Sequence, residues 1–300
     1  MSSDEVVVCI PTYNRSVTLD RAVRSVLAQD HASLTVLISD DASTDDTAAV
    51  CRRLADGDPR VVVRRHERNL GLTANFNWVM QTALDRSRAR DRAYFMFLPD
   101  DDWIEPDYIG RCVEKLANDR GYSLVAGRMC GHDGERSSWY APDVNLEADD
   151  PLRRIAAFCR GVVPSGLLSG VMPIEIAARL PPQRNVVGND WLLLTSVVYL
   201  GKVATLPGTA VHCSADGVSS SLRDLTTTLG VSRYQATKPL LTVGLFLISE
   251  CMRRSPVFRC LPIGSRLQVL AVALTGFLLR RALPLARRGA DRLTRGLSVR

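Results

Sequence analysis

The sequence predicts an α/β protein built on a doubly wound, mostly parallel sheet, with a basic helical appendage at its C-terminal end. Three observations carry this prediction. Short runs of β-branched residues alternate with helical stretches, aspartates directly follow two of those runs, and arginines gather near the end of the chain. Strands that alternate with helices form parallel sheets, whose sites lie at the carboxyl ends of the strands.

The first half of the chain carries the clearest alternation. We predict buried strands where β-branched residues run together and stop at Pro or Asp, and helices where apolar residues recur at helical spacing. The predicted strands are residues 6–10, 34–39, 61–65 and 94–98, and the predicted helices are residues 16–29, 43–54 and 72–84.

The second half is less regular. The same criteria predict strands at residues 123–128 and 202–206, a polar loop at residues 131–150, and helices at residues 106–118, 151–160, 174–180 and 190–200.

Length and composition are those of a folded globular protein. The chain has 300 residues, 46% hydrophobic and 23% charged, which excludes disordered, collagen-like and disulfide-scaffold proteins. Its eight cysteines never form a C-x-x-C pair and accompany only four histidines. Neither a zinc site nor a disulfide framework has the spacing it would need, so we expect reduced, mostly buried thiols.

The net charge of +6 is unevenly distributed. Residues 251–300 hold eleven arginines and one acid, whereas residues 1–250 hold 27 basic and 31 acidic groups. An acidic body with a basic, leucine-rich end argues against nucleic-acid binding and favours contact with an anionic membrane. Residues 1–5 carry acids where a signal peptide would be basic, so we expect a cytoplasmic protein.

Aspartates follow two of the predicted strands. Asp40 and Asp41 end the second strand, and Asp100, Asp101 and Asp102 end the fourth. A parallel sheet brings both groups to one edge. Adjacent carboxylates repel each other, so the triplet favours a divalent cation or hydrogen-bond donors beside it. On charge alone, a solvated acidic loop that caps the following helix stays open as the alternative.

Four ordered motifs resemble the inverting family 2 glycosyltransferases of GT-A fold. The motifs are Val-Cys-Ile-Pro-Thr-Tyr-Asn-Arg (8–15), Ile-Ser-Asp-Asp-Ala-Ser-Thr-Asp-Asp-Thr (38–47), Asn69-Leu70-Gly71 with Asn75, and Phe-Leu-Pro-Asp-Asp-Asp-Trp-Ile-Glu-Pro-Asp (97–107). The resemblance covers about residues 5–220. It implies a catalytic domain at residues 1–225, divided into a nucleotide-binding half (1–105) and an acceptor half (106–225), before a helical, basic, membrane-associating tail (226–300).

The resemblance implies a nucleotide-sugar donor, most simply a UDP- or dTDP-sugar. The residues that it assigns to the donor are Pro11, Thr12, Tyr13, Asn14, Asp41, Asn69, Gly71, Asn75 and Asp100. A tyrosine ring suits stacking on a base, and the carboxylate of Asp41 suits a pyrimidine N3–H. Structural roles stay open for Asp41 as a helix cap and for Gly71 as a turn glycine.

The resemblance also implies a divalent cation, Mg²⁺ or Mn²⁺, at the aspartate triplet. Pro99 stands where many members have the first acid of an Asp-x-Asp motif, which makes Asp101 the ligand, with Asp102 beside it. The choice among the triplet stays open. His212 resembles a family histidine that helps to hold metal or diphosphate, although a lone histidine is also often structural.

The base of an inverting transfer is assigned to Asp190. Gly188-Asn189-Asp190-Trp191 resembles the family's acid-Asp motif at the start of a helix, with Asn189 in place of the commoner Glu. Such a carboxylate would take the proton of the acceptor hydroxyl. The ring of Trp191 would either stack on a sugar or pack in the core.

The sequence therefore predicts an inverting, metal-dependent glycosyltransferase that serves a surface-polysaccharide or polyprenyl-linked glycan acceptor, peripheral to the inner face of the cell membrane. Residues 267–279 form an apolar run of about 20 Å as a helix, too short for a bilayer core of about 30 Å. We expect it to lie in the membrane interface or to pack on the catalytic domain. One alternative is a catalytically silent sugar-nucleotide-binding protein. The other is a phosphatase-like hydrolase, which would need an aspartate nucleophile just after the first strand, and residues 11–14 supply none.

Overall fold

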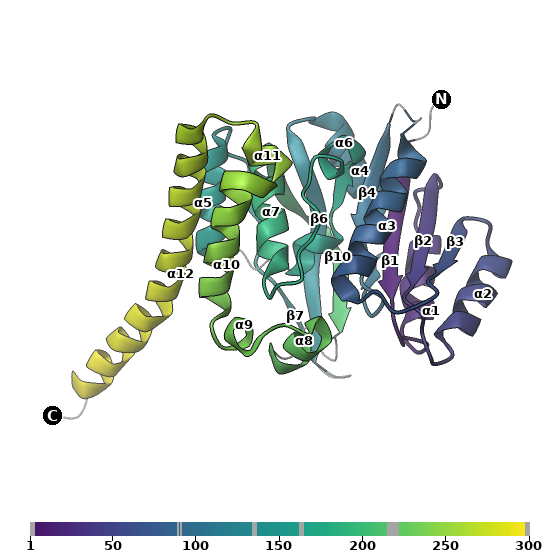
Figure 1. The fold of residues 1–300 in the computed structure, drawn as a ribbon, viewed down its shortest axis with the longest axis horizontal. Helices are drawn as coiled ribbons and strands as arrows, with labels where there is room; N and C mark the ends of the chain where they lie inside the picture. Colours follow the sequence, from purple (N-terminus) through teal and green to yellow (C-terminus); the bar gives the residue numbers. More distant parts are fainter. Residues whose placement is uncertain are drawn as a thin grey trace.

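A ten-stranded sheet forms the centre of the molecule in the computed structural model, which describes residues 4–88, 90, 92–133, 137–161, 165–214 and 222–297 (Figure 1). Its main path runs β3-β2-β1-β4-β9-β6-β10-β5, with β7 paired to β6 and β8 paired to β10. The strands are β1 (Glu5–Thr12), β2 (Leu34–Asp40), β3 (Val61–Arg65), β4 (Ala93–Phe97), β5 (Trp103–Ile104), β6 (Tyr122–Asp133), β7 (Ser137–Tyr140), β8 (Asn145–Leu146), β9 (Val171–Pro173) and β10 (Lys202–Ser214).

Helices cover both faces of the sheet (Figure 1). They are α1 (Leu19–Leu27), α2 (Thr47–Gly57), α3 (Leu72–Ser87), α4 (Tyr108–Asn118), α5 (Pro151–Gly161), α6 (Ile174–Ala177), α7 (Asn189–Leu200), α8 (Leu222–Leu229), α9 (Arg233–Thr237), α10 (Pro239–Ser249), α11 (Pro256–Arg259) and α12 (Ile263–Leu297). A 3₁₀ turn, η1 (Ser165–Ser169), precedes β9, and a π-helical turn, η2 (Glu250–Arg254), follows α10.

The first half of the sheet is parallel, and its strands β1, β2 and β4 are buried on both faces. Val6, Val8 and Ile10 of β1 face a cluster with α1, α2 and α4, whereas Val7 and Cys9 face a second cluster with α3, α5 and α7. Both sets of β1 side chains are almost fully buried. Continuous apolar runs without alternation are typical of such strands. The α/β fold predicted from these runs is confirmed, and the parallel register brings the ends of β1 and β2 together at one sheet edge.

The second half differs from the prediction in several places. Residues 131–150, predicted as a polar loop, contain the end of β6 and the short strands β7 and β8. β10 extends to Ser214, beyond the predicted 206, because after an irregularity between Leu206 and Ala210 it pairs again with the end of β6. These strand ends carry polar side chains, so the period-2 apolar signal that marks a half-buried strand is weak there.

The helices after residue 225 pack on the same core as the sheet. Val243, Val257, Phe258 and Val269 are buried in the cluster that also contains Phe95 of β4. The long helix α12 runs beside α5, on the side of the molecule opposite α2 and β3 (Figure 1). The division at residue 225 stays a prediction, but the helices beyond it complete the hydrophobic core of the sheet.

One stretch of α12 is long and apolar enough to cross a membrane, by length and composition alone. The stretch is Ile263–Arg280, with a mean hydropathy of 1.3, and 17% of it is buried inside the molecule. The expectation that this part of the chain is too short to span was wrong, because the helix continues past the arginines at both ends of the apolar run. Core helices of soluble proteins meet the same criteria.

Candidate functional site at the carboxyl ends of the strands

The loop after β1 is fastened to the loop after β2. Asn14 has a φ of 53°. Its backbone N–H donates to Ser43 Oγ at 2.9 Å, and its Oδ1 accepts from the Thr44 N–H at 2.8 Å. This arrangement buries Thr12 at the strand end and leaves the ring of Tyr13 45% exposed beside it. The ring is therefore available for stacking, whereas the hydrogen bonds of Asn14 hold the loop in place.

Asp41 binds the turn at residues 69–71. The backbone N–H groups of Leu70 and Gly71 donate to the two Asp41 carboxylate oxygens at 2.7 and 2.9 Å, and the carboxylate is buried. Gly71 has a φ of 88°, which favours glycine, and its N–H also lies 2.9 Å from Asn69 Oδ1. The structure thus brings together three predicted donor-binding residues, with Asp41 as the residue that positions the turn.

Asn75 lies deeper, between α3 and β2. Its Oδ1 accepts from the Ser39 hydroxyl at 2.5 Å, and its Nδ2 donates to the Ser39 carbonyl at 3.0 Å. Asn75 is buried, so these bonds satisfy most of its amide. The contacts that the structure gives to Asn75 hold the start of α3 against the end of β2.

The aspartate triplet after β4 is largely withdrawn from water. Asp102 is buried and accepts from Cys213 Sγ at 3.4 Å, whereas Asp100 lies 3.8 Å from the Arg15 guanidinium. Burial raises the pKa of each of these two carboxyls to about 7, and repulsion from Asp101 adds to the increase. Asp101 itself is half-buried, and its carbonyl accepts from Arg21.

The donor set of this triplet fits Mg²⁺ or Mn²⁺. Both ions prefer carboxylate oxygens, and Mg²⁺ is commonly held by one or two carboxylates together with substrate phosphates and water. Buried carboxyls whose pKa is raised to about 7 are also groups that a nearby cation would stabilise in their charged form. That Asp101 and Asp102 would hold the cation stays a prediction.

Cation binding at the triplet is expected to weaken as the pH falls below about 7. In the folded protein Asp100 and Asp102 keep their protons up to a pH of about 7, whereas an unfolded chain loses them near about 4. The folded state therefore binds more protons across this interval, so the free energy of unfolding of the cation-free protein falls as the pH rises through it. Thermal unfolding with EDTA or Mn²⁺, at about pH 6 and about pH 8, measures both effects. Equal Mn²⁺ shifts at the two pH values would contradict this expectation.

The loop before α7 presents Asp190. Gly188 has a φ of 83°, and a Cβ there would lie 2.5 Å from Val243 of α10, so both conformation and space require glycine. Asp190 follows in the first turn of α7, half-buried, and burial raises the pKa of its carboxyl. A raised pKa makes this carboxylate a stronger proton acceptor, as a general base requires.

Asn189 has a structural role in this loop. Its Oδ1 accepts from the Arg184 N–H at 2.8 Å, and its Nδ2 donates to Gln183 Oε1 at 2.8 Å. Gln183 is in turn held by Asn77 of α3 through two backbone contacts, at 2.7 and 2.9 Å. The loop that precedes α7, and with it Asp190, is therefore tied to the nucleotide-binding half of the predicted domain.

The same loop is tied to the C-terminal helices by a buried ion pair. Arg184 Nε lies 2.5 Å from Glu250 Oε1, and the guanidinium also lies over the ring of Phe246 at 4.8 Å. We expect Glu250→Ala to lower the free energy of unfolding by about 3 to 5 kcal/mol, because it leaves the arginine buried without its partner. Urea unfolding measures the change. Glu175→Ala, at an exposed position, is the control, and an equal loss in both variants would refute the role of the pair.

Trp191 packs inside the protein. Its ring lies 5.0 Å from Phe158 of α5 and 4.9 Å from Phe277 of α12, and the Arg280 guanidinium lies 4.8 Å from it. Trp191 was expected either to stack on a sugar or to pack in the core. These contacts are those of a core residue that joins α5, α7 and α12.

His212 lies in a group of side chains that sequence reasoning missed. Its ring contacts His132 at 2.9 Å, and Cys130 Sγ lies 3.7 Å from the same His132 nitrogen. Within the described residues, three potential ligand atoms converge in this group, whereas His212 forms no such group with Asp101 and Asp102. The Cys-x-His spacing at residues 130–132 was the available signal, but its partner comes from another strand.

Comparison with solved structures shows which fold the chain has. The fold is shared with S. aureus TarS 1-349 in complex with UDP-GlcNAc, with a TM-score of 0.62 over 91% of this chain and 72% of that chain at 16% identity. It is also shared with the Pyrobaculum calidifontis mannosyltransferase PcManGT in complex with GDP-Man and Mn²⁺, with a TM-score of 0.54 over 98% of this chain and 79% of that chain at 19% identity. The chain thus has the GT-A type fold that the motifs predicted.

The family model described as Glycosyl transferase family 2 matches residues 7–164. The match covers more than half of the chain, so this protein belongs to glycosyl transferase family 2.

Curated relatives match over part of their length. The putative teichuronic acid biosynthesis glycosyltransferase TuaG of Bacillus subtilis is 29% identical over 161 residues, 53% of this chain and 61% of the relative. The GalNAc(5)-diNAcBac-PP-undecaprenol beta-1,3-glucosyltransferase of Campylobacter jejuni is 32% identical over 120 residues, 40% of this chain and 36% of the relative. This chain thus covers less than two thirds of either relative.

Proposed function

We propose that this protein is an inverting, metal-dependent glycosyltransferase that moves a hexosyl or deoxyhexosyl group from a nucleotide-diphosphate sugar to a surface-polysaccharide or lipid-linked glycan. One observation carries the proposal. In a family 2 chain, three adjacent aspartates lie in the loop after β4, and burial raises the pKa of Asp100 and Asp102 to about 7, so a divalent cation there would supply the opposite charge that these carboxyls lack.

A UDP- or dTDP-sugar is the proposed donor. The exposed ring of Tyr13 is available to stack on the base, beside the Asp41 carboxylate and the turn at residues 69–71 that it holds. A carboxylate accepts from the N3–H of uracil or thymine but not from cytosine, which has no proton there. The UDP-GlcNAc complex of TarS supports this choice of donor class.

The proposed reaction divides between the triplet and Asp190. When bound, Mg²⁺ or Mn²⁺ neutralises the charge that develops on the leaving diphosphate. Asp101 and Asp102 would hold the cation, and Asp100, close to Arg15, lies beside Thr12 at the end of β1. The acceptor oxygen attacks the anomeric carbon from the face opposite the diphosphate as the bond to the diphosphate oxygen breaks, so the anomeric centre is inverted. The acceptor proton passes to Asp190.

An acceptor at a membrane is proposed from the surface of the C-terminal helices. Apolar side chains are exposed on α10 and α12, namely Leu241, Leu245, Ile248, Ile263, Leu267, Leu278 and Leu279. Arginines follow them along α12. One face of α12 packs on the rest of the protein, because Gly276 contacts Cys159 and Phe277 contacts Trp191. A helix with one face packed on the protein lies on a bilayer rather than across it. This arrangement favours a location peripheral to the inner face of the membrane.

Removal of residues 281–300 is expected to weaken membrane binding and leave the fold intact. That segment contains six arginines and one acid, and each arginine near an anionic surface contributes about 1 kcal/mol. Removal of residues 251–300 is expected instead to unfold the protein, since it strips Val257, Phe258 and Val269 from the core. Vesicle sedimentation and circular dichroism of both truncations measure these outcomes. A folded, vesicle-binding protein that lacks residues 251–300 would contradict them.

A panel of nucleotide sugars tests the proposed function. A donor that binds the native state raises its thermal unfolding midpoint by mass action, and here the increase should require Mn²⁺ or Mg²⁺. Release of nucleotide diphosphate from the stabilising donor separates an enzyme from a catalytically silent binding protein. If no UDP- or dTDP-sugar stabilises the protein with either cation, the proposed donor class is wrong.

A further inference from the structure

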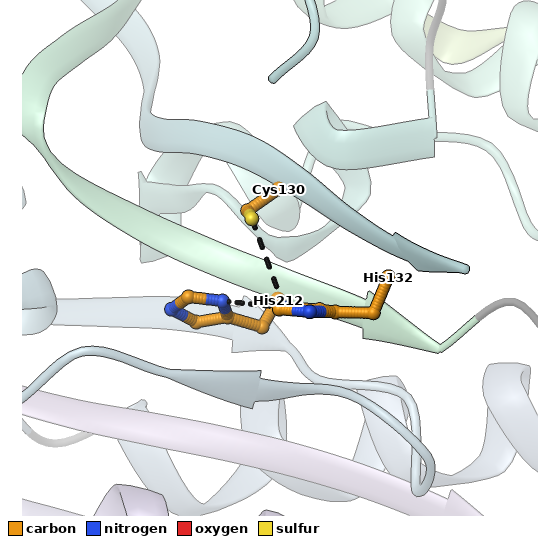
Figure 2. A group of neighbouring side chains, drawn as sticks. All are labelled: Cys130, His132 and His212. Carbon is orange, nitrogen blue, oxygen red and sulfur yellow. Dashed lines mark hydrogen bonds between the residues drawn. The ribbon is translucent and has the colours of Figure 1, made fainter. Parts of the chain in front are cut away.

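Three potential metal ligands converge on one face of β6 and β10. Cys130 and His132 are two residues apart on β6, so their side chains share a face. In the parallel pairing of the two strands, His212 of β10 lies opposite Cys130. The Sγ of Cys130 and one ring nitrogen from each histidine all lie within 4.8 Å of one another (Figure 2).

Two of the three separations between these atoms are close to those of a tetrahedral site. Cys130 Sγ lies 3.7 Å from His132 Nε2, which lies 2.9 Å from His212 Nδ1. A tetrahedral Zn²⁺ with Zn–S of about 2.3 Å and Zn–N of about 2.0 to 2.1 Å would separate such atoms by about 3.6 Å and about 3.4 Å. The two histidine nitrogens would have to separate by about 0.5 Å to bind such an ion, and the third pair, Cys130 Sγ and the His212 nitrogen, lies within 4.8 Å.

The second nitrogen of His212 has the partner that metal-binding histidines use. His212 Nε2 lies 3.5 Å from Glu105 Oε1. A carboxylate at that position keeps the ring proton on Nε2 and leaves the Nδ1 lone pair directed at the other two ligands. The indole of Trp103 stacks on both imidazoles, with centroids 5.0 and 5.1 Å away, and Arg21 lies 3.7 Å from the indole centroid. The two rings are therefore held in place before any ion binds.

The group is separate from the aspartate triplet. Cys213 follows His212 on β10, so its side chain points to the opposite face, where it contacts Asp102. The chemistry also differs, since thiolate and imidazole select Zn²⁺ whereas carboxylates select Mg²⁺ and Mn²⁺.

We propose that Cys130, His132 and His212 form a binding site for a borderline-soft divalent cation of the Zn²⁺ class, with Glu105 as a positioning residue and the fourth coordination position open. The thiol proton leaves to solvent when the ion binds. Because the ligands join β6 to β10, and Trp103 of β5 pairs with His212, a bound ion stabilises this part of the sheet. The proposal is independent of the proposed transfer reaction.

The experiment uses the full-length protein freed of metal with EDTA. Zn²⁺ is titrated to obtain stoichiometry and affinity, and Co²⁺ serves as a spectroscopic probe, because a thiolate ligand gives an intense near-ultraviolet charge-transfer band. We expect one Zn²⁺ per chain, a raised thermal midpoint and a cobalt–thiolate band. Cys130→Ser should lose the band and the stabilisation, and Glu105→Gln should weaken Zn²⁺ binding by about 10- to 100-fold.

Two control variants make the result specific. Cys260→Ser removes an exposed thiol elsewhere and should keep the band. Asp101→Ala should also keep it, even where metal-dependent donor binding is lost, which separates this site from the proposed reaction. His132→Gln provides a second ligand variant if Cys130→Ser does not fold. A wild-type protein without the band, or a band that survives in the folded ligand variants, would overturn the proposal.

Discussion

Asp101→Ala is expected to abolish metal-dependent donor binding while the protein stays folded. Asp101 is half-buried, and the hydrogen bond from Arg21 to this residue is made to its backbone carbonyl, which alanine retains. Asp102 by contrast is buried against Cys213, so its removal would disturb packing as well. A loop acid at a strand end contributes little to the core, whereas a cation shared with a diphosphate needs its carboxylate ligands.

The measurement is the Mn²⁺-dependent increase in thermal midpoint caused by the donor that stabilises the wild type most. Asp85→Ala is a matched control, because Asp85 is an exposed acid on α3 whose contact with Arg88 lies on the surface. It should keep the full increase. Retention of that increase by Asp101→Ala would remove Asp101 from the cation site, and Asp100 and Asp102 would then be tested as asparagine variants.

Asp190→Asn is expected to lower the rate of transfer by about 10² to 10⁴ while donor affinity is unchanged. Asparagine keeps the shape and one acceptor oxygen, so the first turn of α7 is preserved. It cannot accept a proton, and the lost rate corresponds to about 2.7 to 5.5 kcal/mol of transition-state stabilisation. The loss should appear in kcat, because donor binding does not involve this carboxylate in the proposed mechanism.

Asn189→Ala separates the chemistry of Asp190 from its positioning. That variant removes the two hydrogen bonds that hold residues 183 and 184, but leaves the carboxylate in place. It should reduce turnover less than Asp190→Asn and keep the pH dependence of the wild type. Near-normal turnover by Asp190→Asn would return this residue to a role at the start of the helix.

The sequence by itself determined the parallel half of the fold. Runs such as residues 6–10 and 94–98 are apolar at every position, which suits a strand covered on both faces. Aspartates mark the ends of the predicted strands at residues 34–39 and 94–98. These signals are local, since each depends on residues adjacent in the chain. The four motifs that resemble family 2 are local in the same sense, and the family model confirms the assignment that they support.

The tertiary structure decided the roles of several residues within those motifs. Asn75 and Asn189 are polar residues in binding motifs, and the contacts that the structure gives them hold backbone segments. The sequence also gave Trp191 and the helices after residue 225 two possible environments, and the structure packs both against α5 and the sheet core. An apolar stretch of sequence predicts burial, but it does not indicate whether protein or membrane covers it.

The group of Cys130, His132 and His212 depends on tertiary structure entirely. The Cys-x-His spacing at residues 130–132 offers two ligands on β6, but the third lies some eighty residues later on β10, where no local pattern connects it to them. The register of two neighbouring strands joins them, and that register is set by how β10 resumes pairing after its irregularity at residues 206–210. Periodicity along one strand fixes which face a side chain takes, and only the pairing of two strands fixes which side chains meet on that face.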